Sequence, residues 1–381
     1  MNAKSSITTM YEHSEVKVRL YEMYLSRYLN ILGRTFVNRV YLYDLFCGEG
    51  IYENGGKGSP VITLECIKSH YETNSISSNV CRNIDVVFND SEMSEIEPGK
   101  LKIDRVKELT SSIVLPNNVR VFPTSFNYSE LVKKVIVKAS TLPNDARALV
   151  FIDPWGYKEI DPKDLKGLLE CEKVEVLLFL PIHFMYRFAN KALVDSNYKG
   201  GNAIRKFISE LYEHTHKPYF SNEQHFIAEL HKQFKNYLQL DYVDVFKIER
   251  GNNNWFALFF FTHNRKGYWK MLDAKWQIDS KGGKLFKQAD NEGTMFNEYD
   301  HSGYKQTVLK HLQDNHNATN DDLLTLGLQN NFLPKHTKAI LDDIKKTHAI
   351  EILSLDGKAA LSYYLGDESR VVNIRLKHGA N

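Results

Sequence analysis

A hydrophobic run that leads into an acidic residue and a glycine turn constrains this chain more than any other feature. Residues 39–43 read RVYLY and residues 44–50 read DLFCGEG, with Asp44 at the end of the run and Gly48 and Gly50 in the turn. In a nucleotide-binding α/β fold the backbone approaches the ligand at this point, and glycines leave that approach open. The pattern therefore predicts a buried strand whose carboxyl end faces a ligand.

The spacing of the two glycines restricts the kind of ligand. A dinucleotide-binding G-x-G-x-x-G turn requires a third glycine at position 53, where this chain has Glu53. An acidic residue directly ahead of G-x-G suits a cofactor that carries an amino group and no pyrophosphate, and S-adenosylmethionine is such a cofactor. We expect Asp44 to hold its ammonium group, directly or through water, with Phe46, Gly48 and Gly50 around the rest of the molecule.

Composition narrows the class of protein. The chain has 381 residues, 43% of them hydrophobic and 25% charged, which is typical of a globular protein with one domain of about 250 residues and a smaller one of about 80. A formal net charge of +2 gives no general attraction to polyanions, so any nucleic-acid binding depends on local basic patches. The four cysteines form no C-x-x-C pair and the histidines follow no ligand spacing, so we expect no metal site. With neither a membrane span nor a signal peptide in the sequence, a cytoplasmic protein is expected.

Strand-like runs alternate with helical segments along the first two thirds of the chain. An amphipathic helix is expected at 14–32, and Ser59 with Pro60 is expected to begin the helix after the glycine turn. Further strands are expected at 84–88, 119–122, 148–152 and 174–180, followed by a closing antiparallel hairpin at 242–248 and 255–262. This alternation predicts a doubly wound, mostly parallel α/β sheet with ligand-binding residues at the carboxyl ends of its strands.

The pattern also predicts how the chain is divided. Residues 1–280 are expected to form the α/β domain, interrupted at 183–236 by a mainly helical insertion that is a candidate substrate-facing cap. Residues 281–302 are rich in Gly, Asn, Asp and Lys and are expected to form a linker. Residues 303–381 are expected to form a second domain.

Three short helices followed by a hairpin are expected in the second domain. Thr319 with Asp322 matches a capping box, and Pro334 is expected to begin the third helix. Runs at 350–355 and 359–365, joined by Asp-Gly, are expected to pair as a hairpin. This order is typical of a winged helix-turn-helix domain.

The motif DPWGY at 153–157 follows the hydrophobic strand expected at 148–152 and contains the candidate catalytic residues. An exocyclic base amine is a poor nucleophile, because its lone pair is delocalised into the ring. A carboxylate and a backbone carbonyl that accept both N–H bonds favour the pyramidal amine and align it with a methyl donor. Asp153 and the Pro154 carbonyl fit these roles, and Trp155 or Tyr157 fits stacking on an extruded base. The alternative is that Asp-Pro ends a strand and Trp155 fills a gap in the core.

Two other strand ends offer further contacts to a cofactor. Asp90 is placed to accept hydrogen bonds from ribose hydroxyls, and its alternative role is a capping aspartate in a turn. Ser125 and Phe126 are expected to meet the adenine through a hydrogen bond and an apolar contact.

Basic residues gather on the third helix of the expected second domain. Lys335, His336, Lys338 and Lys345 are candidate nucleic-acid contacts, in a major groove or on phosphates. A solvated face on a protein-interaction domain is the alternative.

Four stretches resemble the three-Cys-motif partner proteins, a bacterial family related to class I methyltransferases. They are YLYDLFCGEGIY at 41–52, GSPVITL at 58–64, FIDPWGY at 151–157 and FTHNRKGYWKMLDAKW at 261–276. The resemblance covers most of residues 14–280 and extends to the tail. It implies a class I methyltransferase-like fold with an appended winged-helix module. It also implies a partner that resembles a radical-SAM protein and supplies the cysteine triad, which this chain lacks.

The resemblance leaves the acceptor open. Where the family usually has Phe after Asp-Pro, this chain has Trp155, which keeps an aromatic face and changes the size of the pocket. The motif is also similar to that of tRNA guanine-N2 methyltransferases, so the amine need not be adenine N6. The resulting hypothesis is an S-adenosylmethionine-dependent methyltransferase acting on an exocyclic amine of a DNA or RNA base. The rival hypothesis is a catalytically silent subunit of a nucleic-acid-modification or phage-defence system.

Overall fold

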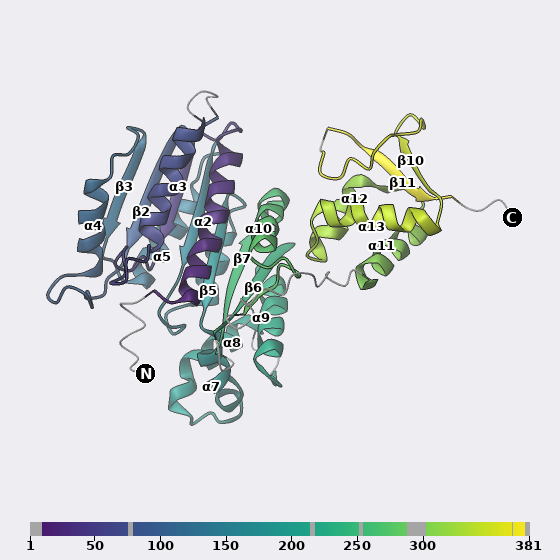
Figure 1. Cartoon of the computed structure of the whole chain (residues 1–381). Coiled ribbons are helices and arrows are strands. Elements are labelled where there is room, and N and C mark those ends of the chain that lie inside the picture. The colour runs from purple at the N-terminus through teal and green to yellow at the C-terminus, as the bar shows by residue number, and fades with distance from the viewer. Residues whose placement is uncertain are drawn as a thin grey trace. The chain divides into compact units, whose positions relative to one another are not determined.

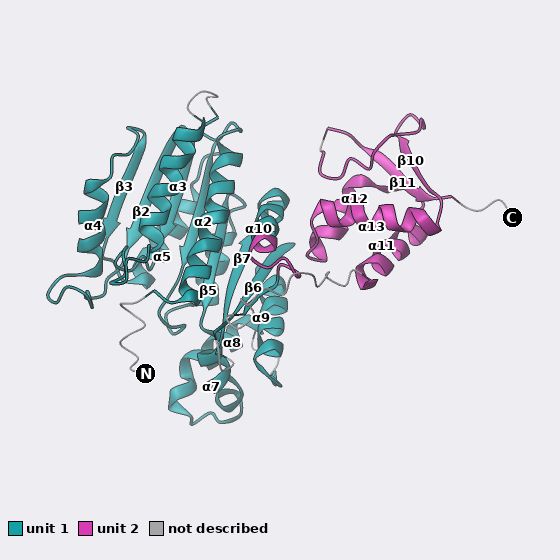
Figure 2. Cartoon of the chain, in the orientation of Figure 1, with its two compact units in different colours: residues 1–274, 284–292 teal, residues 275–283, 293–381 magenta. Residues whose placement is uncertain are grey.

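The chain forms two compact units. The computed structural model describes residues 10–74, 79–213, 218–250, 254–287, 302–367 and 369–377. The first unit contains residues 1–274 and 284–292, and the second contains residues 275–283 and 293–381 (Figure 2).

A mostly parallel eight-stranded sheet forms the centre of the first unit (Figure 1). Its strand order is β3-β2-β1-β4-β5-β7-β6-β8. The strands are β1 (Arg39–Asp44), β2 (Asn83–Asn89), β3 (Val119–Thr124), β4 (Ala146–Ile152), β5 (Val174–Leu180), β6 (Tyr242–Arg250), β7 (Asn254–Thr262) and β8 (Leu285–Lys287). Strands β1 to β5 run parallel and β7 runs antiparallel to both neighbours. The mixed α/β sheet and its closing hairpin are those predicted from the sequence.

Helices cover both faces of this sheet, as the alternating sequence pattern predicts. On one face α2 (Glu12–Leu32) packs beside α3 (Ser59–Asn74) (Figure 1). On the other face α5 (Tyr128–Ser140) packs beside α6 (Pro162–Leu169). A short helix, α4 (Lys102–Ser112), contacts β2 and β3. Every residue of β5 is buried, as expected for a central strand covered on both faces.

Helix α2 is held over the sheet by an aromatic stripe. Its apolar positions recur at helical spacing, and the Tyr21 ring stacks on Phe151 of β4 with centroids 4.5 Å apart. Tyr24 packs on Phe260 of β7 at 4.7 Å. These contacts fix the middle of α2 on the central strands. The preceding turns of the helix therefore lie near the carboxyl ends of those strands, where a site is expected.

The region between β5 and β6 is helical, as predicted, but it is not all cap. It contains α7 (Ile182–Val194), the 3-10 turn η1 (Lys199–Gly201), α8 (Asn202–Leu211) and α9 (Glu223–Leu238). Phe226 and Phe234 of α9 are fully buried, and Phe234 meets Phe259 and Phe261 of β7 edge to face. Helix α9 is therefore the crossover helix on the sheet, and the candidate cap is reduced to α7 and α8, of which α7 begins in contact with β7.

Part of the expected linker belongs to the sheet. Residues 285–287 form β8, which pairs in parallel with Lys247, Ile248 and Glu249 of β6. The surrounding Gly, Lys and Asp residues mask this three-residue strand in the sequence. Most of the rest of the expected linker, 288–301, lies outside the described residues.

The second unit consists of three helices and a small antiparallel sheet. Its elements are α11 (Ser302–Asp314), β9 (Ala318–Thr319), α12 (Asn320–Gln329), α13 (Pro334–Thr347), β10 (Ile350–Ser354) and β11 (Val372–Leu376), with sheet order β10-β11-β9. The predicted capping box is confirmed, because the Thr319 hydroxyl accepts from the Asp322 amide at 3.1 Å and the Asp322 carboxylate accepts from the Thr319 amide at 2.8 Å. The end of α10 (Arg265–Ile278) also joins this unit, where the Trp276 indole donates to the Asn331 carbonyl.

The predicted hairpin partner in this unit is wrong. Strand β10 pairs along its length with β11, and the run at 359–365 makes only a single bridge, between Leu353 and Ala359. The chain leaves the sheet after this bridge, since Leu361 is 98% exposed and Tyr364 has a left-handed φ of 48°. Strand β11 pairs with β10 instead, because it buries Val372 and Ile374 at alternate positions, as a strand with one covered face requires.

Candidate functional site

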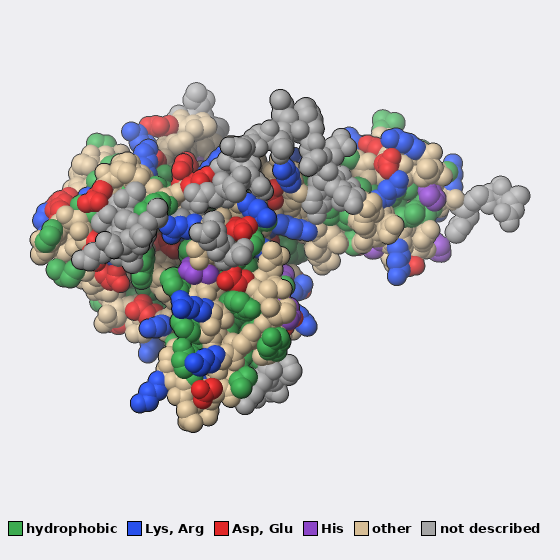
Figure 3. All heavy atoms as spheres, turned by 60° about the horizontal axis from the view of Figure 1, so that its bottom comes forward, with side chains coloured by type: hydrophobic (Ala, Val, Ile, Leu, Met, Phe, Trp, Pro, Cys, Tyr) green, Lys and Arg blue, Asp and Glu red, His purple; other side chains and the backbone are tan. Residues whose placement is uncertain are grey.

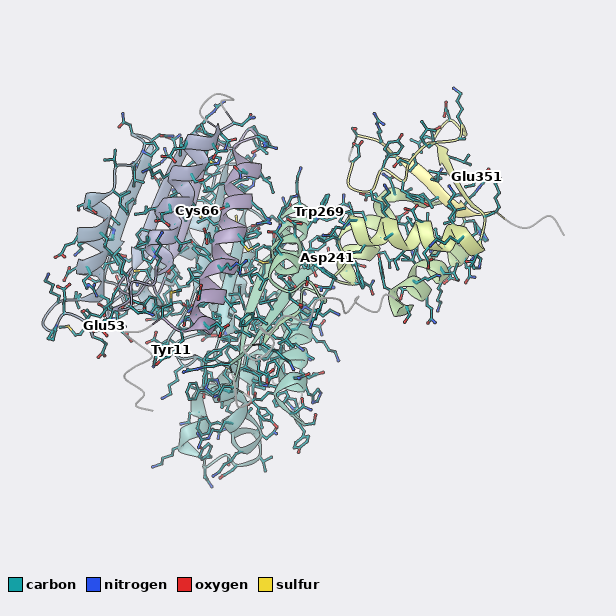
Figure 4. The ribbon with its side chains drawn as sticks, viewed as in Figure 1. Tyr11, Glu53, Cys66, Asp241, Trp269 and Glu351 are labelled. Atoms are coloured by element: carbon teal, nitrogen blue, oxygen red, sulfur yellow. The ribbon has the colours of Figure 1, made fainter. Side chains whose placement is uncertain are left out.

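Three aspartates lie at the carboxyl ends of neighbouring strands. Strand β1 pairs with β2 on one side and with β4 on the other, and Asp44 stands opposite both Phe88 and Phe151. Asp90 and Asp153 each follow two residues after those partners. Because the sheet order reverses at β1, this is the switch point where ligands bind in open α/β sheets. Figure 4 marks the edge with Glu53 and Tyr11, which flank the glycine turn and the start of α2.

The glycine turn has the backbone conformation that the sequence requires. Gly48 and Gly50 have φ angles of +65° and +80°, which favour glycine. A Cβ built on Gly50 lies 2.7 Å from Leu109 Cδ1, so this glycine also serves close packing. A Cβ on Gly48 meets no described atom within 4 Å, so the turn borders open space at Gly48.

Asp44 is a buried carboxylate without a hydrogen-bond partner. Its side chain is 2% exposed, and among the described residues neither carboxylate oxygen meets a donor in hydrogen-bonding geometry. Burial raises the pKa of Asp44 from 3.8 to about 7. The nearby Ser59 hydroxyl and Phe46 amide oppose this shift without reaching hydrogen-bonding geometry, and the Asp153 and Asp90 carboxylates add to it. An unpaired buried carboxylate of this kind is stabilised by a cationic group that binds to it. The ammonium group of a cofactor fits this requirement.

Asp90 is anchored to the glycine turn and keeps acceptor capacity. Its Oδ2 accepts from the Gly48 amide at 3.0 Å, and its Oδ1 accepts from the Glu92 amide at 2.9 Å. Each carboxylate oxygen has a second lone pair, so the group can still accept from a ribose. Burial raises the pKa of Asp90, while the Lys102 ammonium acts in the opposite direction.

Asp153 pairs with a lysine that the sequence analysis did not single out. Lys17 of α2 donates from its Nζ to Asp153 Oδ2 at 2.5 Å, and the same ammonium lies 4.7 Å from the centre of the Phe179 ring. Burial lowers the pKa of Lys17, but Asp153, Tyr52 and Asp44 outweigh burial, so the net pKa is raised and the lysine is charged. An amphipathic helix with one lysine near its start carries no local signal for this contact.

The two aromatic residues after Asp153 have different surroundings. Trp155 is 64% exposed and available to a ligand. Tyr157 is 6% exposed within the hydrophobic core and cannot stack on a base without leaving it. Pro154, directly before Trp155, is buried. Of the two alternatives for stacking, the geometry favours Trp155.

Asn89 organises the loops around the site, and the sequence analysis gave it no role. Its side-chain amide donates to the Leu45 and Phe126 carbonyls at 3.2 and 3.0 Å. Its Oδ1 accepts from the Phe126 amide at 2.9 Å and the Thr124 hydroxyl at 3.0 Å. All four hydrogen-bonding positions of the amide are used, so the loops after β1, β2 and β3 are tied together. The only signal in the sequence is an Asn directly after the strand-like run at 84–88.

The remaining predicted cofactor contacts lie on these loops. Phe46 stacks on Tyr128 with ring centroids 5.0 Å apart. Phe126 is half-buried under the Lys134 ammonium at 4.3 Å, and Ser125 is exposed. Their contact with an adenine stays a prediction.

In the second unit, the predicted nucleic-acid residues do not form one continuous basic surface. Lys335, Lys338 and Lys345 are exposed on one side of α13, and Asp342 lies on the same side at helical spacing. His336 instead caps the helix, accepting from the Leu333 amide at 3.1 Å, and its ring packs 4.1 Å from that of Trp276. Its binding role stays a prediction.

Two further findings concern the described part of the chain alone. There, no three His, Cys, Asp or Glu residues are grouped so that they could hold a metal ion. None of the helices described is long and apolar enough to cross a membrane.

Comparisons with known proteins give only distant likenesses. No family model matches the sequence, and no curated protein matches it. Among solved structures, the chain is similar to protein LPL1258 of Legionella pneumophila, from family model DUF519, at 15% identity and a TM-score of 0.37, over 68% of this chain and 90% of that one. It is also similar to PKMT2 of Rickettsia typhi at 12% identity and a TM-score of 0.28, over 67% of this chain and 56% of that one.

Proposed function

We propose that this chain is an S-adenosylmethionine-dependent methyltransferase that acts on an exocyclic amine of a nucleic-acid base. The observation that carries the proposal is the unpaired, buried Asp44 at the switch point of the sheet, with Asp153 on the neighbouring strand. Asp44 would hold the cofactor's ammonium and Asp90 its ribose, while Gly48 leaves space for its backbone. The cofactor supplies an electrophilic methyl group when bound.

The acceptor side of the site suits a planar base with an amine. Asp153 is at the end of β4 and can accept an N–H, and the exposed Trp155 offers a face for stacking. Asp153 would orient the amine so that its lone pair points to the methyl donor. In this proposal most of the rate acceleration comes from holding the amine nitrogen and the methyl group close together and aligned.

The surface beside the site supports a polyanionic substrate. Helix α7 begins directly after β5, and it exposes Phe184, Arg187 and Lys191. Figure 3 turns the lower edge of Figure 1 toward the viewer and shows Lys and Arg side chains interspersed with hydrophobic ones on this lobe. Basic groups alternating with aromatic rings are typical of surfaces that bind single-stranded nucleic acid. The second unit, as a winged helix, would add affinity for the substrate or recruit a radical-SAM-like partner protein.

Two measurements test the proposal. Calorimetric titration of S-adenosylmethionine into the intact chain should show binding that Asp90→Ala weakens, because a ribose contact is lost. Methyl transfer from labelled cofactor to mixed DNA and RNA should disappear with Asp153→Ala. Asp145 is half-buried and directly precedes β4, at the end of the strand opposite to Asp153. Asp145→Ala is the matched control that should leave transfer unchanged.

One observation favours the second candidate, a catalytically silent binding subunit. The Lys17 ammonium occupies the carboxylate of Asp153, which is the group that an acceptor amine needs. A chain that binds nucleic acid and shows no cofactor binding would support this candidate over the enzyme.

A further inference from the structure

The ion pair between Lys17 and Asp153 places a buried cation among three carboxylates. Three carboxylates, those of Asp44, Asp90 and Asp153, lie at adjacent strand ends. Lys17, which is 8% exposed, is the cation that contacts Asp153 directly. A buried ion pair adds little net stability, because desolvation of both groups offsets their attraction. The fold therefore gives little reason of its own for placing a lysine here.

The proposed cofactor supplies a reason. It carries an α-carboxylate next to the ammonium group that Asp44 would hold, and a buried carboxylate needs a cationic partner. The Lys17 ammonium contacts Asp153, and the carboxylates of both Asp153 and Asp44 raise the pKa of Lys17, so the lysine lies within electrostatic range of the donor side as well as at the acceptor side of the site. Its long, flexible side chain lets the ammonium move between neighbouring carboxylates without movement of α2.

We propose that Lys17 is a positioning residue that exchanges one carboxylate for another when the cofactor binds. Without cofactor, its ammonium pairs with Asp153 and blocks the acceptor position. With cofactor, it pairs with the α-carboxylate, and Asp153 becomes free to accept the N–H of the acceptor amine. The exchange makes binding sequential, because the cofactor must bind before the acceptor base can. This inference rests on the proposed function.

The test compares two ligands that differ by that carboxylate. S-adenosylmethionine and its decarboxylated analogue are titrated calorimetrically into the intact chain and its variants. The intact chain should bind S-adenosylmethionine at least about tenfold more tightly, as expected for a charge-assisted contact. Lys17→Met should reduce this preference to about one, and Lys17→Arg should keep part of it. The exposed Arg19 of the same helix gives the matched control, since Arg19→Met should leave the preference unchanged.

A second variant tests the exchange itself. Asp153→Asn removes the competing partner of Lys17 in the ligand-free site, so the preference for the carboxylated ligand should increase severalfold. A preference that stays the same in Lys17→Met, or falls in Asp153→Asn, would overturn the inference while leaving the methyltransferase proposal intact. Binding of neither ligand to the intact chain would overturn both.

Discussion

At the scale of single residues, the site depends on carboxylates whose ionisation is costly in the ligand-free protein. Asp44 is the clearest case, since it is buried without a partner and its pKa is about 7. In the unfolded chain the same group has a pKa near 3.8. The folded state therefore holds the proton more tightly, so Asp44 favours folding at low pH and this contribution is lost as the pH rises through 7.

Replacing this carboxylate should make the protein more stable at alkaline pH. Asp44→Asn cannot ionise, so at pH 8 it should increase the free energy of unfolding by about 2–4 kcal/mol, the order expected for a shift of about three pKa units. At pH 4 the variant and the original chain should be nearly equal, because Asp44 is protonated in the folded state there. Urea unfolding at both pH values measures the difference. An equal loss of stability at both values would contradict the prediction.

The same ionisation should control cofactor affinity. Because only the ionised Asp44 attracts an ammonium group, the affinity for S-adenosylmethionine should increase between pH 6 and 7.5. Asp44→Asn should bind weakly and without this dependence. Calorimetric titrations across the range measure both effects, and a wild-type affinity that falls over this range would refute the role of Asp44.

Asn89 should stabilise the loops around the site although it contacts no ligand. Asn89→Ala leaves its four partners unpaired and should lower the free energy of unfolding by about 2–3 kcal/mol. Asn89→Asp keeps the acceptor oxygen but replaces the donor with a buried, charged oxygen that faces the Leu45 and Phe126 carbonyls, so it should lower stability at least as much as the alanine variant at neutral pH. Chemical unfolding gives the order of the three proteins, and equal stability of all three would contradict the structure.

At the scale of elements, most of the strands and helices could be predicted because each carries its own signal. Strand β5 is a continuous apolar run, and α12 begins at a capping box that the structure confirms. Strands β8 and β11 were missed, since pairing rather than local pattern determines them. Lys17 was missed for the same reason, because its partner Asp153 is distant in the sequence and only the packing of α2 on β4 brings them together.

Helix α10 should tolerate no side chain at one glycine. A Cβ on Gly267 would lie 2.4 Å from Oε1 of Glu175, a buried residue that also accepts from Tyr24 and Thr262. Gly267→Ala should therefore lower the free energy of unfolding by about 1–3 kcal/mol, as overpacking usually does. Gly303 is near the start of α11 with open space around it, so Gly303→Ala should be neutral or stabilising. Thermal unfolding of both variants checks the prediction, which equal effects would contradict.

The surface of α7 should contribute to nucleic-acid affinity. Arg187→Glu combined with Lys191→Glu should weaken binding of single-stranded oligonucleotides about tenfold or more at low salt and reduce the slope of affinity against salt. Arg34→Glu combined with Lys68→Glu serves as control, because it reverses two exposed charges, one just after α2 and one in the second half of α3. Fluorescence anisotropy at several salt concentrations measures both. Equal weakening by both pairs would indicate that only net charge matters.

At the scale of the whole molecule, the arrangement follows from the strand order of one sheet. Placing β1 between β2 and β4 brings Asp44, Asp90 and Asp153 to one edge, although long stretches of sequence separate them. The sequence alone predicts the acidic strand ends and the class of fold. It does not predict which charge fills the site without ligand, because that depends on a helix from the beginning of the chain.

Donor and acceptor should meet between the ends of β1 and β4. A crystal structure of the chain with S-adenosylhomocysteine would show whether they do. The ligand's ammonium should lie within hydrogen-bonding distance of Asp44, its ribose should contact Asp90, and its sulfur should face Asp153. A ligand bound elsewhere, or one that leaves Asp44 without a contact, would show that this is not the cofactor site.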